Sequence, residues 1–391
     1  MSRSIGSWST RWVGLTADGV AVTVEGREGG ASRRGKPSWH GPLIAVAATM
    51  VALLVAEITV RLTVAEQTLR PFANIYQRDP RPGLGYTLRP NYDGVALTCP
   101  LRTNALGFRG QAWRPEKAEG VLRIALLGDS HAFGYGVRFE ETVGEQLATL
   151  VTTADGIPCE VLNFGVTGYN SRQQAAVFAL EVRRFAPDVV IIIACNNDAD
   201  PPLWVDDHGW MRNGPRGKYL AGEDRYAPPQ EARLARAWEG LAGYSRLALG
   251  AHYLWTRYQM RRAAPPEAAT GEGRDWMGPV EPGAFSPDLR AAVFEPLASI
   301  LSTCRDASID VIVSSYASRV PWRRMLLALG DEFDVPVVEL LGLFPESQSY
   351  DDLVAKFSLG WDTHLGPEAH RRWAVALHRA LRDADYVSER D

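Results

Sequence analysis

Residues Arg123–Gly136 have the sequence RIALLGDSHAFGYG, which contains an apolar run, a turn and the start of a helical pattern. The apolar run Leu122–Leu127 ends in the turn Gly128-Asp129-Ser130, and helical sequence follows. A serine at a strand–turn–helix junction exposes its hydroxyl at the edge of a sheet. Its own N–H lies near a helix N-terminus, where negative charge is stabilised. The stretch therefore predicts a parallel α/β sheet with Ser130 at the carboxyl end of its first strand.

Strand and helix patterns alternate after this stretch. Apolar runs that end in turn residues predict further strands at Cys159–Phe164, Val189–Ala194, Asp310–Ser314 and Pro336–Leu340. Helical spacing predicts helices at Phe139–Val151, from Ser171, at Leu289–Cys304, Trp322–Phe333 and Pro367–Leu381. Such alternation implies right-handed crossovers and therefore a five-stranded parallel sheet.

An insertion at about 199–286 interrupts the alternation after the third strand. It holds a Trp- and Gly-rich loop (203–228), a predicted helix (about 230–262) and a Pro/Gly-rich stretch (265–287). Its position near the carboxyl edge of the sheet is where open α/β folds bind ligands. Two roles stay open for its tryptophans, which either line a substrate cleft or pack a cap onto the core: Trp204, Trp210, Trp238, Trp255 and Trp276.

Composition excludes several classes of protein. The chain has 391 residues, of which 46% are hydrophobic and 23% charged, with a formal net charge of −4. These are ordinary globular values, so the chain as a whole is neither disordered, collagen-like nor coiled coil. The acidic balance argues against a nucleic-acid partner, because such proteins carry a strongly basic domain. A mean hydropathy of −0.16 excludes a polytopic membrane protein.

One segment departs from this average. The run Gly41–Ala56 (GPLIAVAATMVALLVA) has no charged residue, and Leu43–Val60 carries only Glu57. The latter run is about 27 Å long as a helix, close to a bilayer core of about 30 Å. We predict a transmembrane helix over 41–62; a buried core helix and a signal-peptide segment are the alternatives.

The flanks of this helix predict its orientation and the remaining organisation. The basic cluster 33–36 (RRGK) precedes the helix, so the positive-inside rule predicts a disordered cytoplasmic tail over 1–40. Everything after the helix is then periplasmic or extracellular. Prolines spaced through 63–120 predict an irregular linker and small lead-in lobe. The α/β domain is predicted over 121–385.

A serine nucleophile needs a base, and one of the seven histidines is suitably placed. His364 follows Asp362 in a loop just before the last predicted helix, and a carboxylate beside a histidine sets its tautomer. Two loops at neighbouring strand ends offer hydrogen-bond donors, 163–170 (NFGVTGYN) and 195–198 (CNND). Taken alone, each of these loops is also ordinary turn sequence.

Together these motifs resemble the SGNH/GDSL hydrolase superfamily, whose four blocks occur in this order. Here the blocks are GDSHAFG (128–134), NFGVTG (163–168), CNND (195–198) and DTHLGPEAH (362–370). The lead-in sequences LGYTLRPN and TNALGFRG also resemble a segment that precedes this domain in bacterial membrane-anchored members. Two departures stand out. Cys195 replaces the usual glycine of the third block, and one residue rather than two separates Asp362 from His364.

The resemblance implies a three-layer αβα fold with a flavodoxin-like parallel sheet. It implies Ser130 as the nucleophile, His364 as the base and Asp362 as its orienting acid. It also implies an oxyanion hole made of the Ser130 N–H, the Gly168 N–H and the Asn197 side chain. No metal and no cofactor is expected, and no Cys/His group has zinc spacing.

The expected function is an extracytoplasmic ester hydrolase of the esterase or acetylesterase type, acting on a small acyl ester or an acylated glycan. An O-acyltransferase that modifies an envelope or exported glycan would use the same residues. A non-catalytic envelope-binding module is the alternative of another class. A nucleotide-binding flavodoxin-like protein is disfavoured, since the loop after the first strand lacks a phosphate-binding glycine motif. The pairing of Cys99, Cys159, Cys195 and Cys304 stays open.

Overall fold

The structure is a computed structural model. It describes residues 40–64, 75–97, 99–205, 211–212, 245–248, 250–251, 254, 286–316, 320–347, 350–359 and 362–387. The predicted tail over 1–40 therefore lies almost wholly outside the described residues. So do the predicted helix at about 230–262 and four of the five insertion tryptophans, Trp210, Trp238, Trp255 and Trp276.

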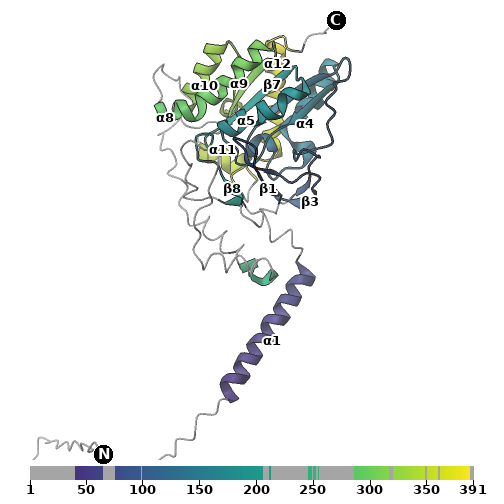
Figure 1. Cartoon of the computed structure of the whole chain (residues 1–391), viewed down its shortest axis with the longest axis vertical. Helices are drawn as coiled ribbons and strands as arrows, with labels where there is room; N and C mark the ends of the chain where they lie inside the picture. Colours follow the sequence, from purple (N-terminus) through teal and green to yellow (C-terminus); the bar gives the residue numbers. More distant parts are fainter. Residues whose placement is uncertain are drawn as a thin grey trace, which may run out of the picture. The chain divides into compact units, whose positions relative to one another are not determined.

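A five-stranded parallel sheet forms the centre of the α/β domain (Figure 1). Its order is β11 (Val337–Glu339), β10 (Asp310–Tyr316), β7 (Val189–Cys195), β5 (Leu122–Gly128) and β6 (Cys159–Asn163). In order along the chain this is 2-1-3-4-5, the flavodoxin-like arrangement. The predicted fold class is confirmed. Strand β5, which leads to Ser130, lies between β6 and β7, so both donor loops emerge beside it.

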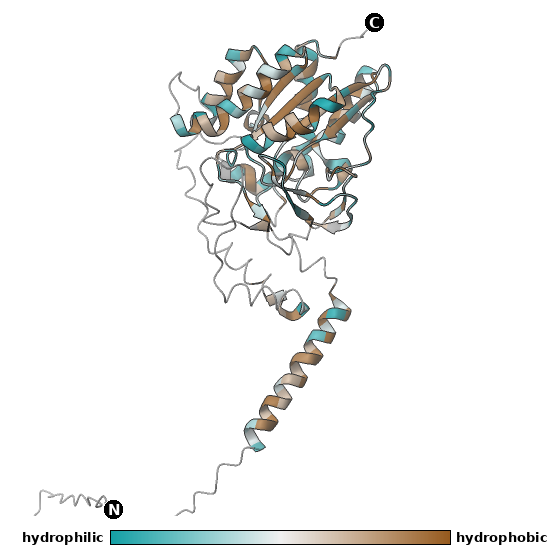
Figure 2. Ribbon diagram, in the orientation of Figure 1, coloured by the Kyte–Doolittle hydropathy of each residue, from teal (hydrophilic) through white to brown (hydrophobic). Residues whose placement is uncertain are grey.

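Alternate residues of each strand face the two helical layers, because side chains alternate across a strand. One face of β7 presents Val190 and Ile192, which pack with α5 (Ser171–Leu180), α9 (Glu295–Asp306) and α10 (Val320–Phe333). The other presents Ile191 and Ile193, which pack with α4 (Val143–Leu150), α11 (Tyr350–Phe357) and α12 (Pro367–Asp383). Apolar strands between helices with hydrophilic outer faces are visible in Figure 2. Both faces of the sheet are buried, which explains why its strands are continuously apolar.

Several helix boundaries differ from the sequence prediction. The helix predicted at Phe139–Val151 divides at Thr142, whose hydroxyl accepts the N–H of Glu145 and so starts α4. Short helical segments flank the main ones: α3 (Ser130–Phe133), Phe139–Glu141, Val151–Asp155, Val182–Phe185, α8 (Pro287–Leu289), Arg290–Phe294 and Leu340–Leu343. The other predicted helices and strands agree to within a few residues.

The lead-in segment is not irregular, which corrects the prediction for 63–120. It contains two antiparallel hairpins, β1 (Tyr76–Asp79) with β2 (Gly85–Leu88) and β3 (Asp93–Ala96) with β4 (Cys99–Arg102). Their apolar side chains belong to the same core as the α5 face of the sheet. The hairpins therefore share a hydrophobic core with the α/β domain. Prolines fit because a two-stranded ribbon leaves backbone N–H positions unpaired along its outer edges.

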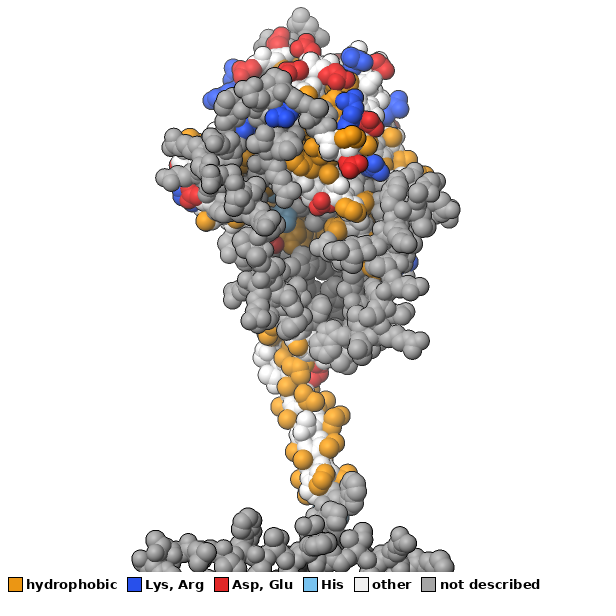
Figure 3. Space-filling view, turned by 90° about the vertical axis from the view of Figure 1, so that its left-hand side faces the viewer, with side chains coloured by type: hydrophobic (Ala, Val, Ile, Leu, Met, Phe, Trp, Pro, Cys, Tyr) orange, Lys and Arg blue, Asp and Glu red, His pale blue; other side chains and the backbone are white. Residues whose placement is uncertain are grey.

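Helix α1 (His40–Thr63) is long and apolar enough to span a membrane. None of its residues is buried, and Figure 3 shows hydrophobic side chains covering its visible face. Near its end, the Glu57 carboxylate accepts hydrogen bonds from Arg61 Nε at 2.6 Å and Ser245 Oγ at 2.8 Å. It also accepts the backbone N–H groups of Arg246 and Leu247. The charge that interrupts the apolar run is thus fully paired.

Of the insertion, the structure describes a small hairpin, β8 (Trp204–Val205) with β9 (Met211–Arg212), and a few residues between 245 and 254. Trp204 is buried. The hairpin contacts β1 and β2 of the lead-in, since Arg78 Nε donates to the carbonyl of Val205 at 2.8 Å.

Candidate active site

Ser130 lies at the carboxyl end of β5, at the first residue of α3. The turn needs Gly128, because its φ is +153° and a Cβ there would lie 2.7 Å from the Cβ of Ala132. Asp129 caps α3 by accepting the backbone N–H of His131 at 2.9 Å. The glycine and the capping carboxylate together hold Ser130 in a fixed place at the sheet edge.

His364 is presented by a loop between α11 and α12. Backbone hydrogen bonds tie this loop on both sides: Leu359 N–H donates to the carbonyl of His364 at 2.9 Å, and Gly366 N–H to that of Phe357 at 2.7 Å. Within the loop, Asp362 Oδ1 accepts the backbone N–H of His364 at 3.0 Å. The single intervening residue therefore makes a tight turn that brings the carboxylate back to the imidazole.

The structure brings Ser130, His364 and Asp362 together in one hydrogen-bonded line. His364 Nε2 lies 2.8 Å from Ser130 Oγ, and His364 Nδ1 lies 2.5 Å from Asp362 Oδ1. A carboxylate only accepts, so Nδ1 carries the proton and Nε2 offers its lone pair to the serine hydroxyl. Burial raises the pKa of Asp362, but hydrogen bonds from His364 outweigh it and hold that pKa below the ordinary value.

Gly168 lies in the loop after β6, beside β5. Its φ is +77°, and a Cβ there would lie 2.4 Å from Leu203 Cδ1, so only glycine fits. Asn163 fixes the start of this loop: its Nδ2 donates to the carbonyl of Ala132 in α3, and its Oδ1 accepts Gly165 N–H. The second block is therefore hydrogen-bonded directly to the turn that carries Ser130.

Asn197 lies in the turn after β7, on the other side of β5. Its Oδ1 is buried and has no hydrogen-bond partner within the described part of the chain. Asp198 anchors this turn, because its carboxylate accepts the backbone N–H of Cys195 at 3.0 Å and Gln174 Nε2 at 2.9 Å. Burial raises the pKa of the Asp198 carboxyl well above its ordinary value.

Cys195, the departure in the third block, is a buried residue whose thiol pKa is raised well above its ordinary value by burial. A thiol with a raised pKa stays protonated, so Cys195 fills space rather than acting as a nucleophile. All four cysteines, Cys99, Cys159, Cys195 and Cys304, are free thiols.

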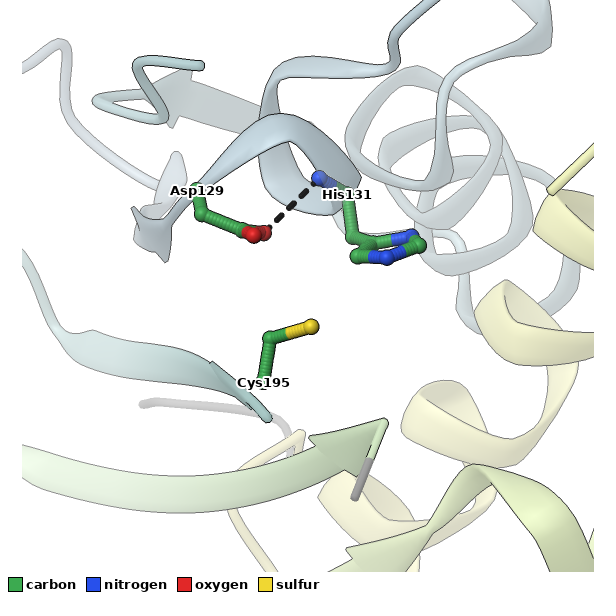
Figure 4. Close-up of side chains that lie close together, drawn as sticks. All are labelled: Asp129, His131 and Cys195. Carbon is green, nitrogen blue, oxygen red and sulfur yellow. Dashed lines mark hydrogen bonds between the residues drawn. The ribbon is translucent and has the colours of Figure 1, made fainter. Parts of the chain in front are cut away.

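Three potential metal ligands meet beneath Ser130, which the sequence spacing did not indicate. The ligand atoms of Asp129, His131 and Cys195 lie within 4.8 Å of one another, and Figure 4 shows the sulfur pointing toward the other two side chains. Ligands of a tetrahedral zinc ion are about 3.5 Å apart. Both carboxylate oxygens of Asp129 are already engaged, one by the N–H of His131 and the other 3.3 Å from Ser130 Oγ. We therefore assign the group to support of the serine turn.

Two further histidines lie near His364 and are neutral. Burial lowers the pKa of His131 to about 4 and that of His370 to about 3. The His131 ring packs 4.3 Å from that of Tyr316 and 5.3 Å from that of His364. His370, in α12, accepts the backbone N–H of Val143 through Nδ1 at 3.2 Å, which requires the neutral ring.

Sequence reasoning missed two residues that border this site. Tyr135 stacks on His364 with ring centroids 4.1 Å apart and planes inclined by 19°. Arg109 is buried and holds the loop that carries Tyr135, donating to the carbonyls of Phe133, Gly134 and Val137. Tyr135 stands in the quoted stretch between two glycines and Arg109 in TNALGFRG. Neither pattern indicates what its side chain will contact.

Comparison with known proteins gives only distant similarity. No family model matches the sequence, and a search of curated proteins finds no match. Among solved structures, a lipolytic protein of the G-D-S-L family from Desulfitobacterium hafniense is 12% identical, with a TM-score of 0.36 over 66% of this chain and 99% of that one. An esterase from Pseudoalteromonas sp. is 11% identical, with a TM-score of 0.37 over 68% and 99%.

An acetyl xylan esterase from Geobacillus stearothermophilus is 12% identical, with a TM-score of 0.37 over 71% of this chain and all (100%) of that one. Because these identities and TM-scores are low, the similarity by itself assigns no activity to this chain. An activity has to follow from the geometry of the site.

Proposed function

We propose that this chain is a serine ester hydrolase of the SGNH/GDSL type, with Ser130 as its nucleophile. The observation that carries the proposal is the line from Asp362 through His364 to Ser130, with hydrogen-bond distances of 2.5 and 2.8 Å. The line joins groups 234 residues apart in the sequence, at the carboxyl edge of a parallel sheet. Nucleophile, base and orienting carboxylate in such a line are the parts that acyl transfer requires.

In the first step, His364 Nε2 takes the hydroxyl proton as Ser130 Oγ attacks the ester carbonyl. The carbonyl π bond breaks, and its electron pair moves onto the oxygen. Asp362 stabilises the imidazolium that forms, because its carboxylate accepts the Nδ1 proton in a hydrogen bond. The tetrahedral intermediate then expels the alcohol, which leaves with the proton held on Nε2. The product of this half of the reaction is an acyl ester of Ser130.

The negative charge on the carbonyl oxygen needs donors that are in place before the reaction. We assign this role to the N–H groups of Ser130 and Gly168 and to the Asn197 amide. Two features support the assignment: β6 and β7 flank β5, so both loops emerge beside Ser130, and the φ of +77° at position 168 favours glycine.

In the second step, water attacks the acyl-serine while His364 takes its proton. Collapse of the second intermediate releases the acid, and the proton returns from Nε2 to Ser130 Oγ. A sugar hydroxyl in place of water would give an O-acyltransferase with the same atoms. Hydrolysis is the reaction we propose, with the acyltransferase as the alternative.

We propose a small acyl group, such as the acetyl of an acylated envelope glycan, as the part of the substrate that Ser130 receives. The support is the resemblance of the four sequence blocks to the SGNH/GDSL hydrolases, together with the extracytoplasmic location proposed for the domain. We propose an extracytoplasmic location for the domain, which rests on helix α1 and the basic cluster before it.

The test of the chemistry is hydrolysis of p-nitrophenyl acetate by the full chain in detergent. Ser130→Ala and His364→Ala should each abolish turnover above background, and Ser130→Ala should also abolish labelling by a fluorophosphonate. Ser299→Ala is a matched control, since Ser299 is a surface serine of α9 that bonds only its own helix. If the wild-type chain neither hydrolyses the ester nor takes the label, the enzyme proposal is wrong and a non-catalytic binding module replaces it.

The location is tested separately with a reporter fused after residue 70 that is active only outside the cytoplasm. An active fusion supports the proposed orientation. Activity of a cytoplasm-specific reporter at the same point would reverse it without affecting the proposed chemistry.

A further inference from the structure

The ring of Tyr135 covers one face of the His364 imidazole. The centroids lie 4.1 Å apart and the planes are inclined by only 19°, so the two rings are nearly parallel. The hydrogen bonds of His364 to Ser130 and Asp362 lie in the plane of its ring, whereas the contact with Tyr135 is perpendicular to it. The three contacts together fix both the direction and the tilt of the imidazole.

The face of an aromatic ring is negative because of its quadrupole, and it attracts a cation placed over it. Before the reaction, His364 Nε2 offers a lone pair to the Ser130 hydroxyl. The imidazole becomes a cation when it takes the Ser130 proton. A ring stacked on it interacts more favourably with the cation than with the neutral form. This difference lowers the energy of the transition state relative to the ground state, which is what accelerates a reaction.

The loop that carries Tyr135 is held firmly enough to keep the ring in place. Arg109 donates three hydrogen bonds to carbonyls on both sides of it, at Phe133, Gly134 and Val137. Gly134, with φ of +79°, makes the turn directly before Tyr135. Tyr135 itself is buried.

The other groups around His364 do not supply this effect. Asp362 lies in its plane, Asp129 caps the serine turn, and His370 lies in α12 with its ring hydrogen-bonded to Val143. His131 presents a ring tilted by 39° at 5.3 Å. Neither His131 nor His370 carries a charge near neutral pH, so neither adds an ionisation of its own to the pH dependence of activity in that range.

We propose that Tyr135 is a positioning residue whose ring face stabilises the cationic form of His364 during acyl transfer. The inference rests on the proposed function, in that His364 must act as the base. It goes beyond that function by giving the base a third partner, which interacts more favourably with the cationic form of His364 than with the neutral form.

The test is the pH dependence of kcat/KM in a series at position 135. Tyr135→Phe keeps the ring face and should retain wild-type behaviour. Tyr135→Leu keeps an apolar side chain but has no quadrupole. It should lower kcat/KM about 3- to 10-fold on the pH plateau and move the midpoint of the acid limb down by about half a pH unit. Phe344→Leu removes a buried ring elsewhere and should leave the midpoint unchanged.

Fluorinated phenylalanines at position 135 keep the shape of the ring, so they guard against a leucine variant that does not fold. Rate and midpoint should both fall in steps as fluorine weakens the quadrupole. Wild-type values throughout the fluorinated series would overturn the proposal and leave Tyr135 a purely steric role.

A last measurement separates this inference from the proposed function. The His364 titration can be followed by NMR of 13C-labelled histidine and assigned with His364→Gln. A downward move of its midpoint across the fluorinated series supports the ring effect even if the chain hydrolyses no ester. An unmoved midpoint overturns it even if the chain is an active esterase.

Discussion

Asp362 makes the shortest contact of the site, 2.5 Å from His364 Nδ1, and it also accepts the backbone N–H of His364. The two contacts have different consequences. The backbone contact shapes the loop, whereas the side-chain contact selects the tautomer in which Nε2 can accept the Ser130 proton. An asparagine at this position would keep an acceptor for the backbone and present an amide donor to the ring.

Asp362→Asn should therefore keep the fold and lose activity. We expect kcat to fall by about 10³- to 10⁴-fold near neutral pH, since the wrong tautomer is favoured and the imidazolium loses its counter-charge. Ester hydrolysis with a circular dichroism spectrum of each variant measures both effects. Asp352→Asn, which removes a partly exposed carboxylate paired with Lys356, is the control. A loss of less than tenfold would mean that Asp362 does not orient the base.

The sequence predicts those site residues that belong to recognisable motifs. Ser130, His364 and Asp362 stand in short patterns whose chemistry is readable, and the structure brings them together. Tyr135 and Arg109 could not be predicted, because a stacked ring and a buried guanidinium depend on which loops fold against each other. Nothing in the local pattern distinguishes Tyr135 from a tyrosine exposed in a turn.

The lead-in segment acts on the site through a buried arginine. Arg109 is 1% exposed and forms no ion pair within the described part of the chain, although Glu140 and Glu141 interact with it electrostatically. It donates hydrogen bonds to three carbonyls of the loop after α3 and to Cys99, and its guanidinium lies 5.0 Å over the Phe133 ring. Burial lowers its pKa from the ordinary value, which reflects the cost of keeping the charge there. The loop carbonyls offset that cost by accepting hydrogen bonds from the guanidinium.

Arg109→Met should reduce both stability and activity. The variant keeps much of the volume but loses three hydrogen bonds from a charged donor, each worth about 1.5–3 kcal/mol. The carbonyls of Gly134 and Val137 keep the weaker donors Val137 N–H and the Cys99 thiol. We expect a loss of several kcal/mol in denaturant unfolding, and a fall in kcat/KM in the folded fraction because Tyr135 is released. Arg102→Met in β4 is the matched control, since that side chain is 77% exposed. Equal stability of the two variants would contradict the proposed role of Arg109 in holding the loop that carries Tyr135.

The alternation of apolar runs and helical spacing predicted the parallel sheet and most of its helices, but not α11. The boundaries moved where a side chain caps a helix, as Thr142 does. The hairpins of the lead-in were missed because their strands are four residues long and Pro100 stands in one of them. In a two-stranded ribbon that proline pairs opposite Val95 without breaking the ladder.

Across the whole domain, two buried neutral histidines make stability depend on pH. Burial lowers the pKa of His131 to about 4 and of His370 to about 3, below the value of about 6.5 of an unfolded histidine. The unfolded chain therefore binds up to two more protons than the folded one between these values. The stability that the two neutral histidines contribute is fully present above the pKa of an unfolded histidine. It is lost as the pH falls below that value.

The two histidines should make the free energy of unfolding fall by up to about 2.7 kcal/mol per pH unit between pH 6 and pH 5. Asp198 opposes this by up to about 1.4 kcal/mol per pH unit, because its raised pKa lets the folded chain hold a proton that the unfolded chain has lost. His370→Gln should lower the slope by about 1.4 kcal/mol per pH unit, because one histidine proton is no longer taken up. Denaturant titrations of both chains at several pH values measure the slopes. Equal slopes would mean that His370 is not the neutral buried group described.

The hydrogen bond between Ser130 and His364 spans 234 residues, and neighbouring strands of the sheet are joined only through long crossovers. Contacts so distant along the chain form slowly, because the loop must close before the contact stabilises anything. Helices and local turns form much sooner. During refolding, hydrolytic activity should therefore return after the helical signal. A partly folded chain would then be compact but inactive, because the proposed active site needs contacts between distant parts of the chain.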